Sequence, residues 1–269
     1  MTAQTAAAAQ SQPQAAITLE DIRHLVRSDF PALSAQIAPT AAQTLGTLAP
    51  LRQWLADTQG KALPDLRHPR IALFLSRHGM AADMQDDLHL LPAALAKPAH
   101  PLSAIAATLN ADLQVYELDI ETASGDPAQG PALGEAEALQ ALSYGMMAVQ
   151  SGVDSAVIAL PNPAAAVAAE NIRTALAKGD DALAALLQFG GFDIAAALGA
   201  AIAARLAKAP VILDDSAEVI GDMLAALAPQ GAAHLRRARN ILPAEMQNPA
   251  AGLRAALALA LATSLAKAA

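Results

Sequence analysis

Short apolar runs alternate along the chain with longer segments in which apolar residues recur every three or four positions. Runs of this length, bounded by polar or turn-forming residues, are typical of strands buried in a sheet. Recurrence every three or four positions is typical of helices that bury one face. The pattern predicts strands at 70–75, 112–118, 154–160 and 210–214.

Helices are predicted before, between and after these strands. In the segment 134–152, one helical face collects Leu139, Leu142, Met146 and Val149. Strands that alternate with helices usually pair in parallel. We therefore expect an α/β fold: one parallel sheet with helices on both faces and extra flanking helices. The remaining helices are predicted after Thr18, at 45–60, at 165–187, from Ile194 onward, around 217–227 and at 251–267.

The sequence pattern also predicts the domain organisation, which is a short tail followed by one domain. Residues 1–17 are rich in Ala and Gln and lack both a basic residue and an apolar core, so they predict a disordered low-complexity tail and no signal peptide. Residues 18–269 contain no linker that would split them, and we expect a single α/β domain. The apolar runs at 194–204 and 255–266 are too short to cross a bilayer, which favours a cytoplasmic protein.

Composition narrows the function classes. Hydrophobic residues make up 54% of the chain and aromatic residues only 3%, so we expect a core of Ala, Leu, Ile and Val. The net charge of −8 argues against binding to nucleic acids or anionic membranes, which require a basic surface. The chain has no cysteine, and this excludes disulfides, thiolate metal sites and cysteine nucleophiles.

Candidate chemistry is sought beyond the carboxyl ends of the strands, where parallel sheets bind ligands. His78 follows the first strand and suits a base or a phosphate contact, with a loop histidine bonded to backbone as the alternative. Asp214 and Asp215 follow the last predicted strand. Such carboxylates suit ribose hydroxyls or Mg²⁺, but Asp215 equally suits the N-cap of the next helix.

Two further patterns have both a structural and a functional interpretation. Gly190 and Gly191 allow a close backbone approach or a positive φ, and Asp193 then caps a helix that begins at Ile194. The basic cluster of Arg236, Arg237 and Arg239 is interpreted as a solvated helix face rather than a phosphate clamp. The acidic segment with Asp83, Asp86, Asp87 and His89 is interpreted as a solvated loop, so we expect no metal and no cofactor.

Four segments carry a resemblance to a known family, in this order: LGTLAPLRQWLADTQG (45–60), RHPRIALFLSRHGMAA (67–82), GPALGEAEALQAL (130–142) and FGGFDIAAALGAAIAARLAKAPVILDD (189–215). They resemble motifs of the nicotinate-nucleotide–dimethylbenzimidazole phosphoribosyltransferase (CobT-like) family of cobalamin assembly. That family moves the phosphoribosyl group of nicotinate mononucleotide to a lower-ligand base. The resemblance implies a Rossmann-like fold, a homodimer, and a nucleotide or benzimidazole-type small ligand.

The resemblance also implies site residues. The ligand-binding positions that match its motifs are His78, Gln85, Asn162, Gly190, Gly191 and Asp214, and the remaining candidates for catalysis are Asp214 and Asp86. We expect any retained pocket to open beside His78, Asn162, Gly190, Gly191 and Asp214.

The departures from the family pattern concern the chemistry itself. The family's aspartate before the histidine is Arg77, a glutamine of its base-binding segment falls on Leu90, and two of its nucleotide-binding glycines fall on Ala159 and Pro161. Its two glutamates near the reacting atoms fall on Val157 and near Ala251. A glycine-rich loop between Asn162 and Gly190 has no counterpart.

Two hypotheses follow from these departures. The first is a transferase whose activity is lost or altered. The second is a non-catalytic binding or partner-subunit protein built on the same fold.

Overall fold

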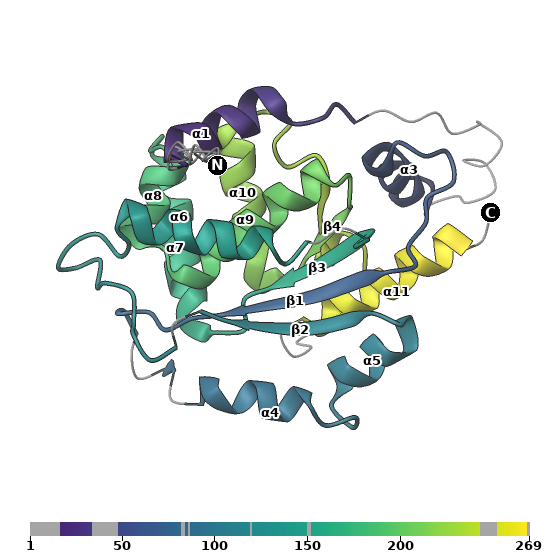
Figure 1. The fold of residues 1–269 in the computed structure, drawn as a ribbon, viewed down its shortest axis with the longest axis horizontal. Helices are drawn as coiled ribbons and strands as arrows, with labels where there is room; N and C mark the ends of the chain where they lie inside the picture. Colours follow the sequence, from purple (N-terminus) through teal and green to yellow (C-terminus); the bar gives the residue numbers. More distant parts are fainter. Residues whose placement is uncertain are drawn as a thin grey trace, which may run out of the picture.

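The computed structural model describes residues 17–33, 48–81, 84–85, 87–118, 120–149, 152–242 and 252–267. Its centre is a sheet in the order β2-β1-β3-β4-β5, in which every neighbouring pair is parallel. The strands are β1 (Pro69–Leu75), β2 (Asp112–Glu117), β3 (Ser155–Ala159), β4 (Val211–Leu213) and β5 (Leu235–Arg237). The prediction of a parallel sheet with helices on both faces is confirmed (Figure 1).

The helices surround this sheet. They are α1 (Leu19–His24), α3 (Ala49–Gln59), α4 (Leu91–Leu95), α5 (Pro101–Leu109), α6 (Glu135–Met146), α7 (Pro163–Ala177), α8 (Ala182–Phe189), α9 (Phe192–Leu206), α10 (Glu218–Leu227) and α11 (Leu253–Lys267). Short helical turns lie at Leu25–Asp29, Leu88–Leu90, Asp215–Ala217 and Ala238–Asn240. Within the described ranges, no helix is both long and apolar enough to cross a membrane.

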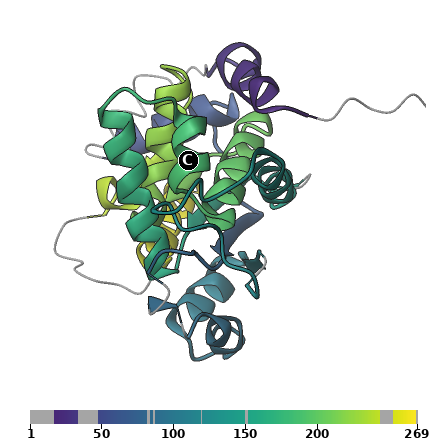
Figure 2. The ribbon, with the colours of Figure 1, turned by 90° about the vertical axis from the view of Figure 1, so that its left-hand side faces the viewer.

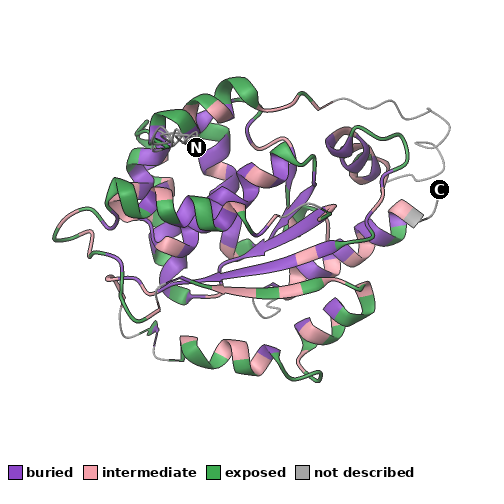
Figure 3. Ribbon diagram, viewed as in Figure 1, coloured by how far each residue is buried: buried purple, intermediate pink, exposed green. Residues whose placement is uncertain are grey.

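Two hydrophobic cores lie on the two faces of the sheet because successive side chains of a strand point in opposite directions. Phe74 and Ile158 pack into the larger core with α1 and the helices α6 to α10. Leu73 and Val157 pack into the smaller core with α3, α5 and α11. Figure 2 shows α4 and α5 on the far side of the sheet from α1. Figure 3 shows that β1, β3, β4 and the central helix α9 are largely buried, whereas the edge strand β2 is half-buried or exposed.

The tightest helix contact joins α6 and α9, and two glycines make it possible. A Cβ atom added to Gly145 would lie 1.8 Å from the carbonyl oxygen of Ala196, and one added to Gly199 would lie 2.0 Å from that of Leu142. The backbones of the two helices therefore touch at both glycines. This contact places the start of α9, and the residues just before it, against the sheet.

The N-terminal segment packs across the ends of helices that come much later in the chain. Arg23 pairs with Asp181 at 2.9 Å, and Arg27 Nε donates to the carbonyl of Leu227 at 3.1 Å. Buried Arg205 donates to the carbonyl of Pro31 at 2.7 Å. These contacts hold residues 19–31 over the larger core.

A buried histidine lies under the same segment. His234 contacts the carbonyl oxygen of Ala201 through Nε2 at 2.8 Å, and the ring of Phe30 meets it edge-on with centroids 6.2 Å apart. Burial is the largest cause that lowers the pKa of His234, to about 3, and nearby Arg205 adds to the effect. The imidazole is therefore neutral in the fold at ordinary pH.

Two sequence predictions were wrong. Arg236 and Arg237 lie in β5 and Arg239 follows in a helical turn, so the basic cluster is not a helix face. Arg236 lies over the ring of Trp54 at 5.2 Å, a tertiary contact that no local pattern contains. The predicted helix 165–187 is two helices, because the chain turns at Gly179 with a φ of 91° and α8 then begins.

Candidate functional site

The candidate site lies where the strand order reverses. From β1 the chain moves to β2 on one side, and then to β3 on the other side, from which it continues to β4 and β5. Open α/β sheets bind ligands at such a reversal, outside the carboxyl ends of the strands. Ser76 and His78 follow β1 at this edge, and Asn162 follows β3.

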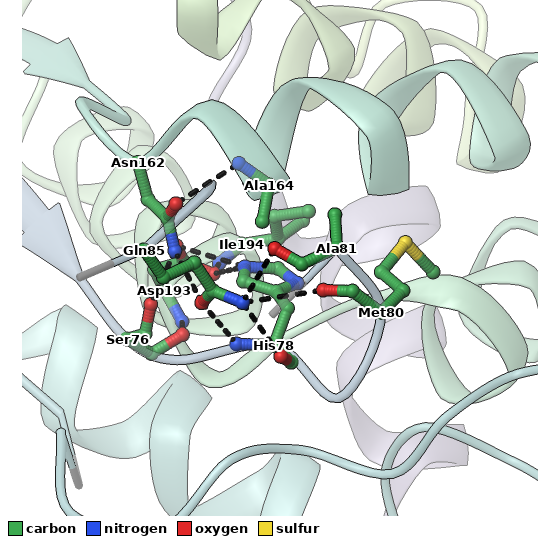
Figure 4. A network of polar contacts seen from close by, with 9 residues as sticks. All are labelled: Ser76, His78, Met80, Ala81, Gln85, Asn162, Ala164, Asp193 and Ile194. Atoms are coloured by element: carbon green, nitrogen blue, oxygen red, sulfur yellow. Dashed lines mark hydrogen bonds and ion pairs between the residues drawn. The ribbon is translucent and has the colours of Figure 1, made fainter. Parts of the chain in front are cut away.

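Gln85 folds the loop after β1 back onto the strand end (Figure 4). Its Oε1 accepts the backbone N–H of His78 at 2.7 Å, and its Nε2 donates to the carbonyl of His78 at 2.8 Å. The same Nε2 also donates to the carbonyls of Met80 and Ala81, both at 3.2 Å. Ala81 has a φ of 51°, a left-handed conformation that disfavours alanine. The buried amide of Gln85 therefore stabilises a tight and strained turn.

Asn162 joins this loop to the start of α7. Its Oδ1 accepts the N–H of Ala164 at 2.9 Å, so the side chain caps the helix. Its Nδ2 donates to the carbonyl of Ser76 at 2.7 Å and to Gln85 Oε1 at 3.1 Å. Asn162 thus ties the ends of β1 and β3 together through contacts inside the protein.

His78 forms a buried pair with Asp193 in the first turn of α9. Its Nε2 lies 3.0 Å and 3.1 Å from the two carboxylate oxygens, and His78 is only 1% exposed. Burial is the largest single influence on the pKa of His78 and lowers it, but the charge and hydrogen bond of Asp193 together outweigh it, so the pKa is raised. His78 Nδ1 is buried and has no partner among the described residues.

The sequence interpretation of Asp193 as a helix cap was wrong in detail. The N-cap of α9 is Gly191, and the helix begins at Phe192. Asp193 accepts the N–H of Ile194 at 2.8 Å within the first turn, and its own N–H donates to Ser76 Oγ at 3.1 Å. The roles of Asp193 and Ser76 in holding His78 were missed. An acid shortly after a Gly-Gly pair was the available signal.

The two glycines serve close approach, and neither has a positive φ. A Cβ atom on Gly191 would lie 2.3 Å from His78 Cε1. One on Gly190 would lie 2.5 Å from the carbonyl oxygen of Leu186. Gly191 therefore belongs to the His78 network, whereas Gly190 ends α8.

The structure places Asp214 at the end of β4 as a cap. It is the residue before the helical turn Asp215–Ala217, and its Oδ2 accepts from Ser216 Oγ at 2.8 Å. The cap is thus Asp214, whereas Asp215 pairs with Arg254 at 2.5 Å. Ser216 Oγ also accepts the N–H of Leu160 after β3, at 3.0 Å. This links Asp214 to the same edge of the sheet, although no bond among the described residues joins it directly to the His78 network.

A cavity of about 230 Å³ lies beside this network. Gln85 is the one predicted ligand residue among its lining groups, which also include Arg77, Leu88, His89, Ile120 and Glu121. The other predicted positions that the structure brings together are buried and turned toward one another. The predicted pocket beside His78 and Asn162 remains a prediction.

Two predicted positions and one departure lie outside the described residues: Asp86 and Asp83 in the loop, and Ala251 before α11. Val157 is described and is fully buried in the middle of β3, where its side chain packs in the smaller core. In the described part of the chain, no three acidic or histidine side chains gather closely enough to hold a metal ion.

Comparisons with known proteins identify the family and the fold of the chain. A family model described as phosphoribosyltransferase matches residues 32–162 and 159–240. Three similar relatives are nicotinate-nucleotide–dimethylbenzimidazole phosphoribosyltransferases, each aligned over 73–74% of this chain and 73% of its own length. They come from Brucella anthropi (27% identical), Roseobacter denitrificans (29%) and Methylocella silvestris (27%).

Two solved structures share the fold. One is the nicotinate-nucleotide–dimethylbenzimidazole phosphoribosyltransferase of Thermus thermophilus, with a TM-score of 0.68 and 19% identity over 92% of this chain and 94% of that one. The other is the CobT protein of the same organism, with a TM-score of 0.70 and 18% identity over 92% and 95%. The strand-end network therefore lies in a fold that these proteins share.

Proposed function

This chain belongs to the phosphoribosyltransferase family, and we propose that within this family it is a divergent member with lost or strongly reduced transfer activity. In this proposal it binds a nucleotide or a benzimidazole-type ligand. It does not move a phosphoribosyl group from nicotinate mononucleotide to dimethylbenzimidazole at a rate typical of the enzymes it resembles.

One observation carries the proposal: the polar side chains at the reversal point are buried and bond mainly to one another and to the backbone, although His78 Nδ1 has no partner among the described residues. His78 is bonded to Asp193, and Gln85 and Asn162 bond to backbone and to each other. All four are buried. A general base has to reach the proton that it removes from the incoming azole, either directly or through one water. His78, Asn162 and Asp193 are enclosed in the fold and do not line the cavity beside Gln85.

A second observation also supports reduced transfer activity: Val157 stands where the motif of the resembling family has a glutamate. Val157 faces the smaller core from the middle of β3, and an alkyl side chain there accepts no proton. Losing one general base typically lowers a rate by about 10²–10⁴-fold. We therefore expect transfer at least about a hundredfold below that of an active relative.

The test is a direct assay of purified protein with nicotinate mononucleotide and dimethylbenzimidazole. The product, α-ribazole phosphate, is followed by chromatography beside an active family member. Turnover within tenfold of that control, abolished by Asp214→Ala or Asp86→Ala, would overturn the proposal and assign a rebuilt active site.

The binding half of the proposal needs its own measurement. Thermal unfolding is followed with nicotinate mononucleotide, dimethylbenzimidazole and α-ribazole phosphate added separately. A ligand at a hundred times its Kd stabilises the fold by about 2.7 kcal/mol. The absence of any shift with all three would contradict ligand binding and favour the partner-subunit alternative.

A second candidate function is transfer to a different base. It is favoured by the cavity beside Gln85, where Glu121 and His89 are exposed and face a volume of about 230 Å³. Either side chain suits deprotonation of a small azole. If phosphoribosyl transfer to a different azole is measured, its loss in Glu121→Gln would support this candidate.

We also propose a homodimer. Tyr144 and Met147 are exposed apolar side chains near the end of α6, and exposed apolar surface commonly marks an interface. Light scattering at tens of micromolar tests this, because a monomer has a mass of 27.4 kDa. A monomer mass would contradict it.

A further inference from the structure

A second polar cluster lies between α7, α10 and the end of β5, and it shares no residue with the strand-end network. Three arginines, Arg173, Arg237 and Arg239, line a groove of about 650 Å³ together with Glu218 and Asp222. Glu170 also pairs with Arg173, at 3.6 Å, so Arg173 and Arg237 each have two acidic partners. Within the described residues, Arg239 has a single acidic partner, Glu218, and is the least neutralised of the three arginines.

Glu218 pairs with two of the three arginines that line this groove. Its side chain is only 6% exposed, and its Oε2 lies 2.7 Å from Arg239 Nη2 and 3.5 Å from Arg237 Nη1. One turn further along α10, Asp222 pairs with Arg237 and with Arg173 Nε, the latter at 3.0 Å. The two acids thus hold the guanidinium groups in fixed orientations. Arginines held in this way lose less freedom when they bind an anion.

Arg239 has unused binding capacity. A guanidinium carries five N–H donors, and the contact with Glu218 is the one that Arg239 makes within the described part of the chain. Its side chain is 51% exposed. Arg239 therefore offers a pre-oriented group that can bind an oxyanion through two parallel hydrogen bonds.

The rest of the groove is apolar and made largely of small residues. Its lining includes Leu176 and Ala177 at the end of α7, and Ala225 and Ala226 on α10. Small side chains leave room for a flat or compact organic group beside the arginines. The combination fits a molecule that carries an anionic group at one end and an apolar body at the other.

We propose that this groove binds a small organic oxyanion, a phosphate monoester or a carboxylate, with the anionic group on Arg239 and the organic body over Ala225 and Ala226. Arg173 and Arg237, each paired with two acids, border the anionic group. The proposal is independent of the transferase activity, since the groove and the strand-end network use different residues.

The experiment is calorimetric titration of the full chain with inorganic phosphate, phenyl phosphate and benzoate. We expect phenyl phosphate to bind more tightly than inorganic phosphate, because its ring adds apolar contact. Binding of benzoate with equal strength assigns general oxyanion recognition, and binding of phenyl phosphate without benzoate assigns phosphate recognition. If none of the three binds at about 10 mM, a concentration of the right order for a single charged contact, the proposal is overturned.

Three variants locate the binding. Arg239→Gln should weaken phenyl phosphate about ten- to a hundredfold, the effect of losing a charge-assisted contact. Arg67→Gln removes the same charge from a distant exposed arginine, paired with Asp65, and should leave the affinity unchanged. Ala226→Trp should weaken phenyl phosphate and leave inorganic phosphate unaffected. Equal affinities in the parent protein and in Arg239→Gln and Ala226→Trp would place the binding elsewhere and overturn the proposal.

Discussion

Replacing Gln85 with glutamate tests whether the loop after β1 is held as described. The substitution keeps the size and shape of the side chain but exchanges its amide donor for an oxygen. In the native protein that donor faces three carbonyl oxygens at 2.8–3.2 Å. In Gln85→Glu at pH 7.5, a carboxylate would face the same three oxygens without a proton between them.

The magnitude follows from burial. Gln85 is only 3% exposed, so water does not replace the lost donor. An unsatisfied buried polar group costs about 1–3 kcal/mol, and an unpaired buried charge costs more. The remaining bonds from the backbone of His78 and from Asn162 offset part of this cost. We expect the free energy of unfolding to fall by about 3–5 kcal/mol at pH 7.5.

The pH dependence gives the sharper readout. The environment raises the folded pKa of the new carboxyl group above its unfolded value of about 4.3. Because the folded pKa is raised, the carboxyl group destabilises the fold at pH values above its unfolded pKa. This destabilisation disappears as the pH falls to the unfolded pKa. Near pH 4.3 the protonated side chain again donates to the carbonyl of His78, and the loss should shrink to about 1–2 kcal/mol.

Urea unfolding followed by circular dichroism measures both values, with the parent protein at each pH as the reference. Gln140→Glu is the matched control: Gln140 is exposed on α6, and its change should stay within about 0.5 kcal/mol. A loss below 1 kcal/mol at pH 7.5, or an equal loss at both pH values, would refute the described role of Gln85.

Further predictions concern glycines and histidines. Gly191→Ala should lower the free energy of unfolding by about 1–3 kcal/mol because its Cβ would lie 2.3 Å from His78 Cε1, whereas Gly130→Ala, with open space around it, should not. Gly199→Ala should cost more in the same urea assay, since its Cβ would meet the backbone of α6 at 2.0 Å, which outweighs the gain of about 1 kcal/mol for alanine in a helix. The raised pKa of His78 predicts stability that is complete below pH 6.5 and falls as pH rises through the folded pKa, a decline that should vanish in His78→Gln. The lowered pKa of His234, about 3, predicts the reverse: stability falls as pH drops from 6.5 toward 3, and His234→Gln should flatten that limb of the pH profile.

Local patterns predicted the longer elements well and the short ones poorly. The predicted strand 70–75 lies within β1 (Pro69–Leu75). It was predictable because its apolar residues are buried on both faces of the sheet, which leaves an uninterrupted apolar run in the sequence. β5 was missed because it has three residues, two of them arginines, and its stability comes from pairing with β4. The break between α7 and α8 was signalled by Gly179, but the apolar periodicity continues on both sides and concealed it.

The candidate site, too, was predictable from the sequence only in part. The order of strands and the resemblance together indicate that His78, Gln85 and Asn162 share one edge of the sheet. The sequence does not indicate that these side chains bond to one another, because that depends on the path of the loop between them. The pairing of His78 with Asp193 joins residues 115 positions apart, and only the contact between α9 and the sheet determines it.

The N-terminal segment has a consequence for the order of events during synthesis. Its contacts with Asp181, Arg205 and Leu227 lie 158 to 200 positions later in the chain. At a translation rate of about 5–20 residues per second, those partners emerge roughly 10–40 s after the segment itself. Throughout that interval the apolar side chains of Ile22 and Val26, buried in the finished protein, lack these later parts of the core to pack against. The helix α1 is thus synthesised early but docks late, and a chaperone that binds nascent apolar segments would meet it before its partners exist.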